Sequence, residues 1–107
     1  MTELTRKLGQ AQEDFVREQD TVFRVYTENL PGTSALFGRY FGGFTVISAQ
    51  GYWRGTFEAS LIFEVIGKGS DLQNVIHAAN DIRHVNHQQA VLVAWQDSKF
   101  HQLLLTE

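Results

Sequence analysis

The order of apolar patterns along residues 21–107 is the feature that most restricts how this chain can fold. In some segments apolar and polar residues alternate, which is typical of strands. In the segments between them apolar residues recur every three or four positions, which is typical of helices. The predicted elements are a strand at 22–27, a short helix beginning at Thr33 or Ser34 and stopped by Gly42 and Gly43, strands at 44–53 and 56–67, a helix capped by Ser70 or Asp71, and a strand at 88–96.

This β-α-β-β-α-β order predicts an α+β fold of the ferredoxin-like kind, an antiparallel sheet with two helices on one face. Residues 99–107 are a possible extra strand at a sheet edge. The second helix has the clearest pattern, because its apolar positions follow the i, i+3, i+4, i+7 rule. These positions are Leu72, Val75, Ile76, Ala79 and Ile82.

The length of 107 residues fits a single domain. Residues 1–20 are polar and mixed in charge, so they form either a polar N-terminal helix or a flexible tail. Residues 21–107 then form one ferredoxin-like domain. Two helices cover one face of its sheet only, and some residues predicted for the other face are hydrophobic. We therefore expect a dimer or trimer that buries this face.

The third predicted strand mixes carboxylates with isoleucines on one face. Alternation places Phe57, Ala59, Leu61, Phe63 and Val65 toward the helices. The opposite set is Glu58, Ser60, Ile62, Glu64 and Ile66. A face merely exposed to water does not need the isoleucines, and an unpaired buried carboxylate is costly. The mixture predicts either a subunit interface with salt bridges or a ligand pocket, and both interpretations stay open.

The bend "GYWRG" between the second and third strands contains two aromatic side chains and an arginine, which a turn does not need to reverse the chain. Gly51 and Gly55 suit a hairpin or a bulged bend. Alternation sends Tyr52 and Trp53 to opposite sides, so that one of them joins the face of Glu58. Aromatic rings suit a cationic, aromatic or ribose-bearing ligand, although they also close the ends of ordinary sheets.

Composition excludes several classes of function. The chain has no cysteine, which removes disulfides, thiol nucleophiles and thiolate metal sites. A net charge of -3 gives no support for nucleic-acid binding. No apolar run approaches the roughly 20 residues of a membrane span, and no signal-peptide region precedes the first strand. We therefore expect a cytoplasmic protein with neither nucleic-acid nor membrane partners.

Metal and hydrolytic chemistry are also not expected. His77 and His84 are two helical turns apart, whereas helical metal pairs are one turn apart. His84 and His87 lie where the helix is expected to fray, so surface or capping roles are favoured. No serine stands in a nucleophile-elbow context.

Three segments together resemble known proteins: "GGFTVISAQGYWRG", "FEASLIFEV" and "NHQQAVLVAWQDSKFHQLL". They are similar to a family of small uncharacterised bacterial proteins with a G-x-W-R bend, a glutamate-bearing strand and a Q-x-x-V-L strand. They also resemble the phage-encoded S-adenosylmethionine lyases, formerly called hydrolases. The resemblance spans about residues 22–104.

The resemblance to the lyases implies a PII-like trimer with sites between neighbouring subunits, in the cytoplasm of an infected host. It implies cleavage of S-adenosylmethionine to methylthioadenosine and homoserine lactone by the substrate's own carboxylate, without a cofactor or metal. Depletion of this methyl donor would counteract host restriction-modification. The alternative is a non-catalytic PII-like oligomer that binds a nucleotide or metabolite.

The resemblance also implies roles for particular residues. In the lyases a tyrosine near the bend and a glutamate on the next strand act together, which points to Tyr52 and Glu58 as the catalytic pair. Trp53 is the nearer match to the tyrosine in some registers, and Glu64 is the other candidate glutamate. The substrate-binding residues implied are Gln50, Trp53, Ser60 and Glu64.

Overall fold

The computed structural model describes residues 20–106. The prediction of a polar helix or flexible tail at residues 1–20 lies outside this range, apart from Asp20. The elements are β1 (Asp20–Glu28), α2 (Thr33–Phe37), β2 (Thr45–Trp53), β3 (Thr56–Lys68), a short 3-10 turn (Gly69–Asp71), α3 (Leu72–Val85), β4 (Ala90–Gln96) and β5 (Phe100–Thr106).

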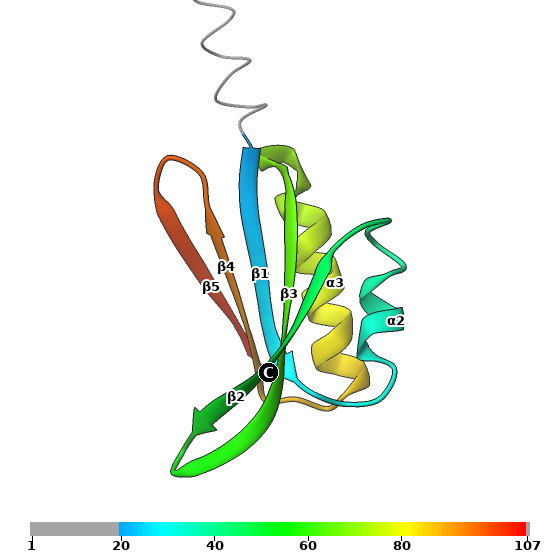
Figure 1. Ribbon diagram of the computed structural model, residues 1–107, viewed down its shortest axis with the longest axis vertical. Helices are drawn as coiled ribbons and strands as arrows, with labels where there is room; N and C mark the ends of the chain where they lie inside the picture. The colour runs from blue at the N-terminus through cyan, green and yellow to red at the C-terminus, as the bar shows by residue number, and fades with distance from the viewer. Residues whose placement is uncertain (1–19, 107) are drawn as a thin grey trace, which may run out of the picture.

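All five strands form one antiparallel sheet in the order β2-β3-β1-β4-β5. Both helices lie on the same side of this sheet (Figure 1). The predicted ferredoxin-like α+β fold is confirmed, and the possible extra strand is β5, which pairs with β4 at the sheet edge.

The core lies between the sheet and the helices. Phe23 and Val25 of β1 and Phe63 of β3 are buried against Val75 and Ile82 of α3. Leu61, Phe63 and Val65 face the helices as predicted. Phe57 and Ala59 share this side but are exposed, Phe57 by 66%, because the end of β3 that carries them runs past the helices.

The first helix is shorter than predicted. It ends at Phe37 with Gly38 at its C-terminal cap, not at Gly42 and Gly43, and Gly32 rather than Thr33 or Ser34 occupies the N-cap. The reason is tertiary packing of the aromatic residues. The Phe37 ring stacks on the Phe63 ring with their centroids 4.6 Å apart. Its centroid lies 5.2 Å from that of Phe41 and 4.9 Å from that of Phe44. An irregular segment after Gly38 brings these rings onto the sheet where a continuous helix would turn some of them away.

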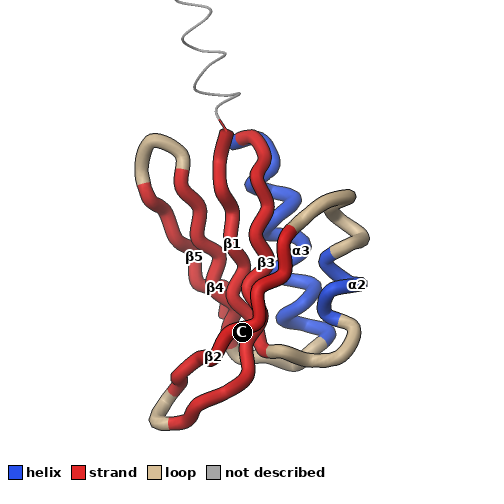
Figure 2. The backbone as a smooth tube through the Cα atoms, viewed as in Figure 1, coloured by secondary structure: helices blue, strands red, loops and turns tan. Residues whose placement is uncertain are grey.

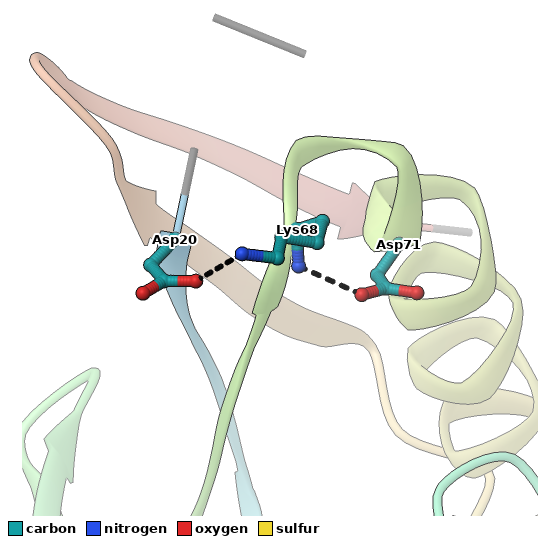
Figure 3. Close-up of polar contacts among 3 residues, drawn as sticks. All are labelled: Asp20, Lys68 and Asp71. Atoms are coloured by element: carbon teal, nitrogen blue, oxygen red, sulfur yellow. Dashed lines mark hydrogen bonds and ion pairs between the residues drawn. The ribbon is translucent and has the colours of Figure 1, made fainter. Parts of the chain in front are cut away.

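Charged residues join the sheet to α3 at the end where β1 begins (Figure 3). Lys68 Nζ lies 2.6 Å from Asp20 Oδ1, and Lys68 N donates to Asp71 Oδ2 at 2.8 Å. Of the two predicted caps, Asp71 stands at the N-cap of α3, and its carboxylate accepts this bond from the residue that ends β3. The contact directs the chain from β3 into the helix.

Among residues 20–106, no helix or loop covers the sheet face opposite the helices, which is called the uncovered face below. It carries exposed apolar side chains from three strands, which are Ile47, Ile66, Phe100 and Leu104. No described helix is long and apolar enough to cross a membrane.

Candidate functional site

The β2–β3 hairpin projects beyond the rest of the sheet, at the end opposite the start of β1 (Figure 2). Trp53 pairs with Thr56, so Arg54 and Gly55 alone form the turn. Their φ angles are 50° and 83°, and positive values at both central residues define the type I′ turn that matches strand twist. Gly51 does not form the bend, because it lies within β2 opposite Glu58.

A cavity of about 530 Å³ lies on the uncovered face, where the hairpin leaves the sheet. Its volume is within the range of small-molecule sites. All five strands and the loop between α3 and β4 contribute to it. The lining residues are Tyr26, Thr27, Glu28, Ala49, Gln50, Gly51, Tyr52, Trp53, Glu58, Ser60, Ile62, His87, Gln88, Gln89, Ala90, Leu92 and Leu104.

Glu58 and Ser60 lie on the part of β3 that lines this cavity, and both are partly buried. Gly51 is directly opposite Glu58 on β2 and keeps the space beside them open. A Cβ at Gly51 would lie 2.6 Å from Ser60 Oγ, which is too close for any side chain without displacement of the hydroxyl. The absence of a side chain at Gly51 thus leaves Glu58 and Ser60 accessible to a ligand.

The two aromatic residues of the bend separate as predicted. Trp53 pairs with Thr56 and lies on the side of Glu58, whereas Tyr52 pairs with Phe57 on the other side. The Tyr52 ring contacts Phe57 edge-on at 5.0 Å, and both aromatic residues of the bend border the cavity. Trp53 is therefore the bend residue that shares a face with Glu58. Gln50 lies on the side of Tyr52 and also borders the cavity.

Glu64 lies on the same face as Glu58 but is not among the cavity residues. It is six residues further along β3, which at about 3.3 Å per residue is roughly 20 Å away. Its carboxylate Oε2 is 2.8 Å from Arg24 Nε in a partly buried ion pair. One group of a small ligand therefore cannot contact both glutamates within this chain.

Several cavity residues were not singled out by the sequence. Tyr26 and Glu28 come from the end of β1, and Leu92 and Leu104 from β4 and β5. Alternation with the buried Val25 and Thr27 would have placed Tyr26 and Glu28 on the uncovered face. Their proximity to the hairpin depends on the strand order, which brings β1 beside β3.

Gln88 is the buried polar residue that joins the walls of the cavity. Its Nε2 donates to Thr27 Oγ1 at 2.6 Å, and its Oε1 accepts from Thr27 Oγ1 at 3.0 Å and from Glu28 N at 3.3 Å. Gln88 and Thr27 are both nearly inaccessible to solvent. This glutamine opens the Q-x-x-V-L pattern noted in the sequence, and the network ties the end of β1 to the loop that precedes β4.

The part of the chain that the structure describes gives the cavity an acidic lining. Glu28 and Glu58 line it, and among residues 20–106 no lysine or arginine does. Two groups outside the cavity have a shifted pKa. A hydrogen bond to Asp81 raises the pKa of Tyr40, and a bond from Lys99 N, supported by His101, lowers the pKa of Asp97. Within residues 20–106 no group of three His, Asp or Glu side chains is placed to hold a metal ion.

Comparison with solved structures identifies proteins of the same fold. A phage S-adenosylmethionine lyase in its apo state matches with a TM-score of 0.64 and 14% identity, over 81% of this chain and 89% of that chain. A phage S-adenosylmethionine lyase in complex with S-methyl-5'-thioadenosine matches with a TM-score of 0.62 and 14% identity, over 82% of this chain and 92% of that chain. No protein-family model and no curated protein matches the sequence. At this identity the similarity establishes the shared fold.

Proposed function

We propose that this protein binds S-adenosylmethionine in the hairpin cavity and cleaves it as a lyase. The observation that carries the proposal is a cavity with aromatic and carboxylate side chains on the uncovered face of a fold shared with phage S-adenosylmethionine lyases. One of those structures holds S-methyl-5'-thioadenosine, which is a product of the proposed reaction.

In the proposed reaction the substrate carboxylate attacks its own γ-carbon. A carbon–oxygen bond forms as the carbon–sulfur bond breaks, and the bonding pair leaves with sulfur. The products are homoserine lactone and methylthioadenosine, and no water is consumed. A sulfonium and a carboxylate become neutral, so a water-poor cavity favours the transition state if it holds the substrate folded for in-line attack.

The cavity residues suit these requirements without a strong acid or base. Glu58 is proposed to bind the substrate's ammonium group or ribose hydroxyls, with Ser60 beside it. Trp53 shares the face of Glu58 and is proposed to stack on adenine or to lie against the sulfonium. Tyr52 and Gln50 are proposed to contact the substrate from the rim of the cavity. The acidic lining matches the positive charge at sulfur.

We further propose a homotrimer in which neighbouring subunits complete the sites. Exposed apolar side chains on the uncovered face, Ile47 and Ile66 among them, would be buried by such an assembly. The ion pair of Arg24 and Glu64 lies on this face and would then be located at the interface between subunits. In a host cell, depletion of S-adenosylmethionine would limit restriction-modification methylation, which is the proposed biological role.

The decisive experiment incubates the protein with S-adenosylmethionine and detects methylthioadenosine and homoserine lactone by chromatography. Glu58→Gln is expected to lower turnover by at least about tenfold, because it removes a charge that contacts the substrate. Glu64→Gln is the matched control from the same face of β3, and its effect is expected to fall on assembly instead. No product at micromolar enzyme would contradict lyase activity. Binding of S-adenosylmethionine without product would support the non-catalytic metabolite-binding alternative.

A further inference from the structure

Two residues with a strained backbone are located beside the same cavity. Among residues 20–106, Arg54 and His87 are the non-glycine residues with positive φ, at 50° and 54°. The left-handed region is sterically costly for a residue with a Cβ, whereas glycine adopts it freely. Both occur in turns where glycine or asparagine is the usual residue.

His87 closes the C-terminal end of α3. Gln88 N donates to Arg83 O at 2.9 Å and His87 N donates to His84 O at 3.2 Å, which are the two bonds of the Schellman motif. The left-handed residue of this motif is usually glycine. Here the side chain is an exposed imidazole that lines the cavity. The helix end itself gives no reason for histidine at this position.

Arg54 is the first central residue of the type I′ turn, where asparagine is usual. Its Cζ lies 5.4 Å from the centroid of the Trp53 ring. A guanidinium at this distance from an indole makes a cation–π contact, which favours one orientation of the ring. Trp53 lines the cavity, so Arg54 acts on the site through its neighbour.

We infer that both residues serve the ligand site: His87 contacts the bound ligand through its imidazole, and Arg54 positions Trp53 against it. The inference rests on the proposed function, with S-adenosylmethionine and methylthioadenosine as the ligands. Strained backbone conformations collect at functional sites, where the side chain is needed despite its cost. The imidazole offers a ring face for the purine and ring nitrogens that hydrogen-bond ribose hydroxyls.

The first part of the test needs no ligand. His87→Gly and Arg54→Asn relieve the strain, so their thermal unfolding midpoints are expected to equal or exceed that of the wild type. His84→Ala is the control, since His84 is an exposed histidine in the last turn of α3 that does not line the cavity. A lower midpoint for either strain-relieving variant would show that its side chain stabilises the fold, and would overturn the inference for that residue.

The second part measures binding of S-methyl-5'-thioadenosine by calorimetry and turnover of S-adenosylmethionine. His87→Gly is expected to bind about tenfold more weakly, with His84→Ala unchanged. Arg54→Asn is expected to raise KM several-fold with little change in kcat, and Arg54→Lys, which keeps the cation, to recover most of the loss. Normal binding by His87→Gly, or a normal KM for Arg54→Asn, would overturn this inference alone. A wild-type protein that neither binds nor turns over these compounds would overturn the proposed function as well.

Discussion

Replacement of Gln88 by alanine is expected to destabilise the protein by about 3 kcal/mol. The Gln88 side chain is 4% exposed and bonds to Thr27 Oγ1 and Glu28 N. Its removal leaves a buried hydroxyl and a partly buried N–H without their partner, at about 1–3 kcal/mol for each unsatisfied group. The lost methylene adds about 0.8 kcal/mol, and water that enters the gap offsets part of the total.

Urea denaturation at one protein concentration measures this loss directly. For a domain of this size, 3 kcal/mol corresponds to a fall of roughly 12–24 °C in the thermal midpoint. Gln89→Ala is the matched control, because Gln89 is the adjacent exposed glutamine and its loss is expected to cost under about 0.5 kcal/mol. Gln88→Leu keeps most of the volume but not the bonds, and it should also be destabilised. A Gln88→Ala variant within about 0.5 kcal/mol of wild type would refute the role given to the network.

Three further substitutions test the site, the core and the turn between β4 and β5. Gly51→Ala should lower turnover at least about tenfold with an unchanged circular dichroism spectrum, since its Cβ would lie 2.6 Å from Ser60 Oγ; wild-type turnover would contradict the open space inferred there. Phe63→Ala should cost about 3–5 kcal/mol in urea denaturation, because the fully buried ring stacks on Phe37, and a loss below about 1 kcal/mol would exclude that packing. The pKa of Asp97 is lowered by the bond from Lys99 N, so its contribution to stability is present above the ordinary aspartate pKa and is lost as pH falls through the lower folded value. Asp97→Asn should therefore flatten the acid side of the stability profile, and a slope equal to that of the wild type would show that Asp97 does not contribute.

The β-α-β-β-α-β order and the facing of β3 were predictable because periodicity is a local property. Strand alternation repeats every two residues and helix spacing every 3.6, so neighbouring side chains alone report them. Leu61, Phe63 and Val65 face the helices for this reason. The same alternation separated Tyr52 from Trp53 correctly.

The residue at which the first helix ends could not be predicted from the local sequence. Three glycines follow Thr33 within ten residues, and the sequence does not say which one ends the helix. Gly38 ends it because the rings of Phe41 and Phe44 pack with Phe37 on the sheet. That contact depends on the third strand, which the chain reaches only later.

The composition of the site likewise depends on contacts between residues far apart in the sequence. The amino-acid sequence by itself determined the strand and helix order and the face that Glu58 shares with Ser60, through spacing that adjacent residues impose. The strand register then placed Trp53, and not Tyr52, on this face. Tertiary structure alone paired Glu64 with Arg24 and set Gln88 against Thr27, 61 residues away. It also placed the turn between β2 and β3 beyond the helices, beside the cavity that Glu58 lines. These outcomes depend on strand order, register and twist, which arise from the packing of the whole sheet.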